Sequence, residues 1–156
     1  MPSGIVFCNQ THLLMGYQPE KLKITGIGGK AIGDESAIET AFRETVEELL
    51  GINPKPKQVK FLISQFPVFK TAINGNYKMF ILDFHDLETF LLHCKNKFDS
   101  SPYYESFPET LEDLILKRTA CKDAEVITLA LVPFVHRCVE LETCDMDAVL
   151  YSNGTS

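Results

Sequence analysis

The sequence predicts an α/β fold, and three observations support this class. Short strand-like runs open the 156-residue chain, a strongly periodic helical segment follows, and strand-like and helical segments then alternate. Apolar residues make up 45% of the chain and charged residues 23%, which is ordinary globular usage. We therefore expect one domain over residues 1–148, with a flexible tail at 149–156.

Three short strands are expected at the start, at residues 4–8, 12–17 and 21–25. Each run has a strand-like composition and is bounded by residues that favour turns or loops, among them Asn, Gly and Pro. Together these runs predict an opening sheet.

A helix is expected between Ser36 and Leu50. Its apolar face shows helical spacing, with these residues at positions i, i+3, i+4, i+7 and i+11: Ile38, Ala41, Phe42, Thr45 and Leu49. Ser36 and Glu39 have the spacing of a capping box, and Gly51 is placed to end the helix in a left-handed turn.

The second half of the chain is predicted to alternate strands and helices. Residues 59–69 and 77–85 are rich in β-branched and aromatic residues and flank an Asn-Gly-Asn turn, so two strands, which can form a hairpin, are expected. The remaining segments are two helices, a buried strand and a final helix, at 86–98, 109–118, 125–134 and 135–142.

Charge and cysteine usage limit the function classes. A net charge of −6 disfavours nucleic-acid binding, and the lysine cluster at residues 55–60 is interpreted as a solvated loop. Five cysteines form no CxxC pair, so neither a zinc site nor a disulfide framework is indicated. No apolar run approaches the ~20 residues of a membrane span, and the start lacks a basic signal region. A cytoplasmic protein without membrane contact is expected, and the sequence leaves open whether it forms a homodimer.

Three acidic residues, Glu44, Glu47 and Glu48, share the helix face opposite the apolar one. Their like-charge pairs at i,i+3 and i,i+4 each cost about a few tenths of a kcal/mol if they are merely solvated. One interpretation is a water-facing helix with salt bridges. The other is a divalent cation such as Mg²⁺, which takes carboxylate ligands together with water and phosphate oxygens.

A glycine pair just before the helix favours the metal interpretation. Gly28 and Gly29 would let the backbone turn sharply and bring a carbonyl oxygen close to a metal ion, which a residue with a side chain would hinder. An acidic helix that only faces water has no use for such a pair.

The spacing of these residues resembles the Nudix box, the signature of hydrolases that cleave nucleoside diphosphates linked to another moiety. The matching residues stand at the family's offsets: Gly29, Glu35, Arg43, Glu44, Glu47 and Glu48. The final glycine, Gly51, stands one residue later than in the family, so the helix is expected to run one residue further. The resemblance implies a Nudix-type α/β/α sandwich with a mixed central sheet.

The resemblance also implies a catalytic site for Mg²⁺ or Mn²⁺. The implied ligands are one backbone carbonyl and three carboxylates: Gly29, Glu44, Glu47 and Glu48. In the family's pattern the three glutamates are the catalytic residues, and Glu44 would also orient the attacking water. Glu35 and Arg43 would have the structural role of holding the loop and the helix together.

Outside the box, similar enzymes complete the site with a glutamate just ahead of a late strand. Glu125 stands at this place, and Glu109 and Glu112 are the alternative candidates for this glutamate. The other interpretation of Glu125 is a surface acid at the start of a strand.

The expected substrate is a small-molecule nucleotide with a pyrophosphate bond. Lys30 is a candidate phosphate contact, and Tyr103, Tyr104 and Phe107 are candidates for stacking on a base. Pro67 resembles a mark of ADP-ribose hydrolysing members. Several functions stay open: hydrolysis of ADP-ribose, a nucleotide sugar or a nucleoside triphosphate, hydrolysis of a diphosphoinositol phosphate, mRNA decapping on capped RNA, or a Nudix-fold binding module without catalysis.

Overall fold

The structure is a computed structural model that describes residues 2–18, 21–67, 69–119 and 128–133. In chain order the elements are β1 (Ser3–Phe7), β2 (His12–Gln18), β3 (Lys23–Thr25), β4 (Ile27–Gly29), α1 (Ala37–Leu50), α2 (Pro56–Ser64), β5 (Lys70–Asn74), β6 (Tyr77–Leu82), α3 (Phe84–Lys97), α4 (Leu111–Leu116) and β7 (Thr128–Pro133). The α/β class predicted from the sequence is confirmed.

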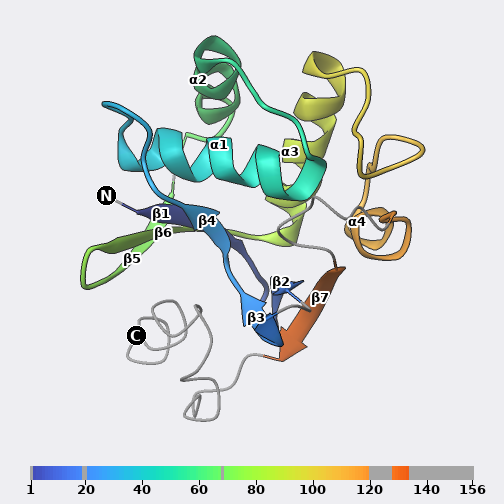
Figure 1. Cartoon of the computed structure of the whole chain (residues 1–156), viewed down its shortest axis with the longest axis horizontal. Helices are drawn as coiled ribbons and strands as arrows, with labels where there is room; N and C mark the ends of the chain where they lie inside the picture. Colours follow the sequence, from blue (N-terminus) through green and yellow to red (C-terminus); the bar gives the residue numbers. More distant parts are fainter. Residues whose placement is uncertain (1, 19–20, 68, 120–127, 134–156) are drawn as a thin grey trace.

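The strands form two sheets, which are seen in Figure 1. The four-stranded sheet has the order β4-β1-β6-β5 and is mixed, because β1 and β6 run parallel while the outer pairs are antiparallel. The three-stranded sheet has the order β3-β2-β7 and is antiparallel. A mixed sheet was expected, and the structure contains one.

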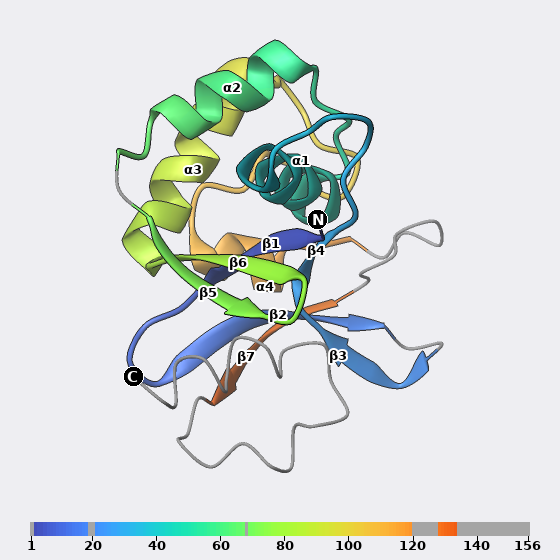
Figure 2. The same ribbon diagram turned by 90° about the vertical axis from the view of Figure 1, so that its left-hand side faces the viewer.

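Strand β1 lies between two layers, because successive side chains of a strand alternate between its faces. Ile5 and Phe7 belong to the larger core, which the helices share. Val6 belongs to a smaller core with Leu13 and Met15 of β2. Helices α1 and α3 pack on one face of the mixed sheet, α2 packs on these helices, and the second sheet lies on the other face (Figure 2).

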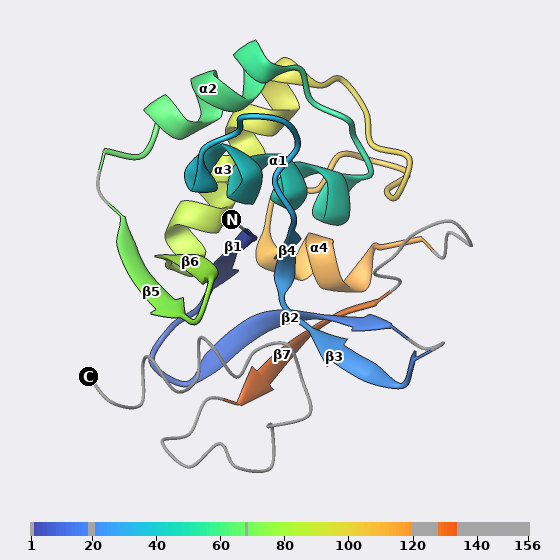
Figure 3. The ribbon, with the colours of Figure 1, turned by 60° about the vertical axis from the view of Figure 1, so that its left-hand side comes forward.

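The resemblance implied helices on both faces of the sheet. In the described ranges the second face is covered by the three-stranded sheet, as the view in Figure 3 also shows. The helix expected at 135–142 and the tail expected at 149–156 lie outside the described residues.

Residues 56–64 form a helix, α2, whose residues 59–64 were expected to belong to a strand. Pro56 stands at the start, and the Gln58 side chain accepts a hydrogen bond from the backbone N–H of Lys55 at 2.9 Å. Val59 and Leu62 are buried at helical spacing. Burial of one helical face therefore outweighs the β-rich composition of this segment.

A hairpin is present, but its first strand is β5 rather than residues 59–69. Gly75, with a φ of 62°, makes the turn to β6, a conformation that glycine adopts at low cost. Within the described ranges, none of the helices combines the length and apolar character that a membrane crossing needs.

Candidate functional site

Both ends of α1 are formed as the sequence predicts. Ser36 and Glu39 make a capping box, with backbone-to-side-chain distances of 2.9 and 3.3 Å. The helix runs to Leu50, and Gly51 caps it in the left-handed region with a φ of 68°. A side chain at Gly51 would also meet the ring of Tyr103, since an added Cβ would lie 2.8 Å from it. Gly51 therefore allows both the left-handed turn that ends the helix and the close approach of the Tyr103 ring.

The three acidic residues of α1 differ in their environment. The side chains of Glu44 and Glu47 are 17% and 30% exposed, whereas Glu48 is buried at 9% exposure. The sequence placed all three on a face away from the core. Burial of a carboxylate is costly unless a charge or hydrogen bonds compensate it, so this face is more than a solvated surface.

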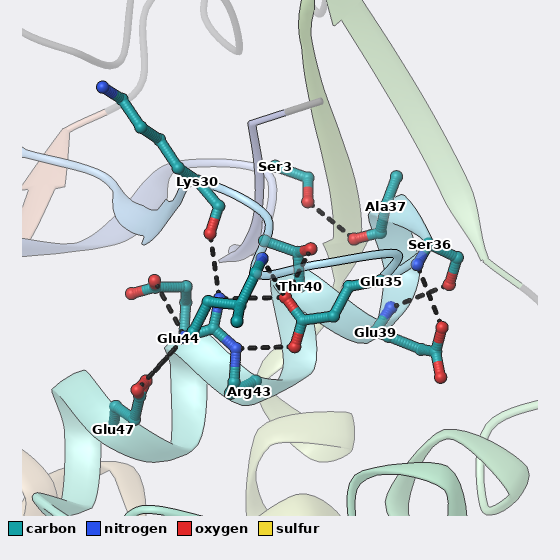
Figure 4. A network of polar contacts seen from close by, with 11 residues as sticks. Ser3, Lys30, Glu35, Ser36, Ala37, Glu39, Thr40, Arg43, Glu44 and Glu47 are labelled. Carbon is teal, nitrogen blue, oxygen red and sulfur yellow. Dashed lines mark hydrogen bonds and ion pairs between the residues drawn. The ribbon is translucent and has the colours of Figure 1, made fainter. Parts of the chain in front are cut away.

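Arg43 is the centre of the polar network drawn in Figure 4. Its guanidinium donates to both carboxylate oxygens of Glu35, at 2.7 and 3.0 Å, and to the backbone carbonyl of Lys30 at 2.9 Å. Its Nη1 atom also lies 2.8 Å from Glu47 and 3.1 Å from Glu44. One buried cation thus joins the loop before α1 to two acids on the helix.

The network shifts the pKa values of its members. Burial alone would raise the pKa of Glu35, but hydrogen bonds from Arg43, from the Ile32 backbone and from Thr40 together outweigh it, so this pKa lies below its ordinary value. The bond to Glu35 and the nearby Glu47 and Glu44 charges raise the pKa of Arg43 despite its burial. Both groups are therefore held in their charged forms.

The glycine pair does not make the sharp turn expected from the sequence. Gly28 and Gly29 are extended residues of β4, and Gly33, with a φ of 59°, lies in the loop that follows. Their lack of side chains matters for another reason. An added Cβ would lie 2.2 Å from the Tyr77 hydroxyl at the first glycine, and 2.4 Å from Glu44 Oε1 at the second. The second glycine thus leaves room for a carboxylate.

The donor set has the chemistry of a hard-cation site. Three carboxylates on the last two turns of one helix, one of them seated against a strand glycine, are oxygen ligands of the type that Mg²⁺ takes. Within the described residues, no group of three or more His, Cys, Asp or Glu side chains is arranged to hold a metal ion as it stands. Because Arg43 already pairs with Glu44 and Glu47, a cation would have to share these two carboxylates with it.

The aromatic residues predicted to stack on a base lie against the core. Tyr104 is buried, and its hydroxyl donates to the Leu114 carbonyl at 2.6 Å. Tyr103 and Phe107 are partly buried and pack against the same core. The guanidinium of Arg118 lies 4.8 Å from the centre of the Tyr103 ring. These contacts differ from the open stacking surface that the sequence suggested.

The other predicted substrate and metal residues lie apart from this network. The Lys30 side chain is exposed and extends away from it (Figure 4). Pro67 is exposed between α2 and β5, and so does not lie within a strand. Glu109 pairs with a lysine of α3 at 3.3 Å, and Glu112 lies in the first turn of α4. Glu125 lies outside the described residues.

Two residues that the sequence analysis missed hold the end of α1. Arg118 donates to the carbonyls of Glu48 and Leu49, both at 2.7 Å, and the Ser101 hydroxyl donates to the carbonyl of Leu50. One sequence signal was available, since the last turn of α1 carries two acids and no basic residue. It indicates that a cation is needed but does not say which one.

The fold and the site define an α/β protein that presents a carboxylate-bearing helix against the glycine-containing edge strand of a mixed sheet. No protein-family model matches the chain, and no curated protein matches it. Among solved structures, it is similar to a bifunctional NMN adenylyltransferase/ADP ribose pyrophosphatase from Francisella tularensis, with a TM-score of 0.45 and 14% identity. The match covers 99% of this chain and 39% of that chain, so this chain spans less than half the length of that protein.

Proposed function

We propose that the protein is a metal-dependent hydrolase that cleaves the pyrophosphate bond of a nucleoside diphosphate linked to another moiety. The spacing of the Nudix box supports this function. The proposal depends on one observation: the Glu44 carboxylate lies against Gly29. A Cβ added at this glycine would lie 2.4 Å from Glu44 Oε1. A helix whose acids only met water would not need a glycine on the facing strand.

The residues for a divalent cation are Glu44, Glu47, Glu48 and the carbonyl of Gly29. When bound, Mg²⁺ or Mn²⁺ would supply positive charge to the phosphate oxygens and make a bound water more acidic. Glu44, which is partly exposed, would hold the attacking water by accepting a hydrogen bond from it.

Arg43 has a defined part in this arrangement. Since it bonds Glu35 on the loop and also reaches Glu44 and Glu47 on the helix, it fixes the two acids relative to the loop before substrate arrives. Ligands that are positioned in advance need less ordering when they bind. Binding of a cation would then loosen the bonds from Arg43 to the two helix acids while the bond to Glu35 persists.

A second candidate is a Nudix-fold binding module without catalysis. The pairing of Arg43 with two of the three carboxylates favours this alternative, because an internal cation already offsets part of their repulsion. Neither proposal specifies the group attached to the diphosphate. The Nudix-box spacing fits several substrates: ADP-ribose, nucleotide sugars, nucleoside triphosphates, diphosphoinositol phosphates and capped RNA.

Cleavage of a panel of these compounds with Mg²⁺ or Mn²⁺, followed by chromatography of the phosphorylated products, tests the proposal, because hydrolysis of a linked diphosphate leaves one phosphate group on each product. Glu48→Gln should lower the rate by about 100-fold or more, since it removes part of the charge that holds the cation. Glu39→Gln is the matched control, because it changes the same charge on the same helix while an amide can still complete the capping box.

Equal rates for the wild type and Glu48→Gln would rule out hydrolysis at this site. Nucleotide binding without turnover in the wild type would favour the binding module instead. A wild type that consumes one compound, together with an active Glu39→Gln and an impaired Glu48→Gln, would support the hydrolase.

A further inference from the structure

We propose that Arg118, which stands outside the Nudix box, is a positioning residue for the acidic pair Glu47 and Glu48. This inference rests on the proposed function, because it concerns how the same carboxylates are placed to receive a divalent cation. Arg118 contacts the backbone of the helix, and its effect on the cation passes through that backbone.

The first observation is the termination of α1. The last carbonyls of a helix have no partner within the helix and must find one elsewhere. Arg118 donates to the carbonyls of Glu48 and Leu49, both at 2.7 Å, through two different guanidinium nitrogens. Two bonds from one planar group fix the orientation of this turn as well as its position.

The second observation is electrostatic. The C-terminal end of a helix carries a partial negative charge, so acids there are unfavourable and cations are favourable. The last turn of α1 contains Glu47 and Glu48 and has no basic residue. Arg118 supplies the missing positive charge from a position 70 residues further along the chain.

The third observation is that Arg118 is itself held in place. Its guanidinium lies 4.8 Å from the Tyr103 ring centre and 5.6 Å from that of Tyr104. The Tyr104 hydroxyl accepts a hydrogen bond from Nη1 at 3.1 Å, and the Thr119 N–H donates to the Tyr103 carbonyl at 2.9 Å. Tyr103 and Tyr104 therefore hold the Arg118 side chain in position.

These observations together give the residue a specific role. The two bonds and the positive charge act on the turn from which Glu47 and Glu48 project, so Arg118 sets where this pair presents its carboxylates. A side chain that only stabilised the fold would affect unfolding but not cation affinity. The two roles can therefore be separated by experiment.

The test compares Arg118→Gln with Ser101→Ala by thermal unfolding in EDTA and across a titration of MnCl₂ or MgCl₂. Both changes remove a donor from the end of α1, but only the first removes a charge. Both should lower the melting temperature in EDTA. Only Arg118→Gln should weaken the apparent affinity for the cation, by about fivefold to tenfold, because the loss of the two charge-assisted bonds that position the ligands outweighs the relief of repulsion between Arg118 and the cation.

Arg118→Lys is the second variant, and it allows cation affinity to be measured even if Arg118→Gln does not fold. It can still donate to a carbonyl of the last turn but lacks the planar fork that bonds two, so its cation affinity should fall between those of the wild type and Arg118→Gln. In the hydrolase assay, kcat should fall in the same order while KM changes little.

Three outcomes would overturn the inference. If Arg118→Gln and Ser101→Ala show the same cation affinity as the wild type, Arg118 has only a structural role, while the proposed function stands. If Arg118→Gln does not fold and Arg118→Lys binds the cation like the wild type, the inference also fails. If the wild type shows no cation-dependent shift at millimolar metal, the proposed metal site fails and this inference fails with it.

Discussion

The carboxylate of Glu44 occupies the space where a side chain at Gly29 would stand. The two residues come from different elements, α1 and β4, and an added Cβ would lie within 2.4 Å of Oε1. A side chain at Gly29 would therefore displace the end of the Glu44 side chain, whereas the extended backbone at this position does not itself need glycine.

Gly29→Ala should destabilise the protein by about 1 kcal/mol, because the methyl group displaces the end of the Glu44 side chain and weakens its pairing with Arg43. The change in unfolding free energy can be measured by urea denaturation. In a Glu44→Ala background the same substitution should cost clearly less, since the obstructing carboxylate is gone. An equal cost in both backgrounds would show that Glu44 is not what Gly29 accommodates.

The ion pair of Glu35 with Arg43 should make the stability of the protein depend on pH. Glu35 has a folded-state pKa below its ordinary value of 4.5, so its contribution is fully present above that value and is lost as pH falls through the lower, folded value. Glu35→Gln should therefore cost about 2 kcal/mol at pH 7, as expected for hydrogen bonds to a charged group, and progressively less below pH 4.5.

Unfolding of both proteins in urea between pH 3 and pH 7 checks this prediction. Glu105→Gln, at an exposed loop position, is the control and should track the wild type. A difference between the wild type and Glu35→Gln that stays constant down to pH 3 would contradict the assignment.

Burial raises the pKa of the Tyr104 hydroxyl, and this effect outweighs the opposing charge and hydrogen bond of Arg118. We expect that, in an ultraviolet titration of the five tyrosines, one will ionise later than the ordinary value of 10.0. Because the folded value is raised, the associated stability is present below pH 10 and is lost as pH rises beyond it.

Tyr104→Phe should remove this late step and leave the ionisation of the remaining tyrosines unchanged. A late step that persists in Tyr104→Phe would assign the delayed ionisation to another residue. Ordinary titration of Tyr104 would restore it as an exposed surface on which a base could stack.

Local sequence signals predicted α1 well, because its determinants lie within one segment. The capping box of Ser36 and Glu39, the apolar spacing and the glycine at residue 51 all act over a few positions, and the helix has the expected ends. The opening strands were also found, since their apolar runs are bounded by turn residues.

Local signals failed where two tendencies competed. In residues 59–64, β-branched and aromatic residues favoured a strand, but the spacing of Val59 and Leu62 allowed a helix to bury one face against α1 and α3. Propensity is a weak effect, and packing against neighbours decides such segments.

By itself, the sequence determined the acidic face of α1, the caps of that helix and the spacing that resembles the Nudix box. Only the tertiary structure decided that Gly29 makes room for Glu44 and that Tyr103 and Tyr104 support Arg118. It also decided that Arg118 ends the helix from 70 residues away. The reason is physical: capping and periodicity depend on neighbours along the chain, whereas close approach and charge compensation depend on residues that meet only after folding.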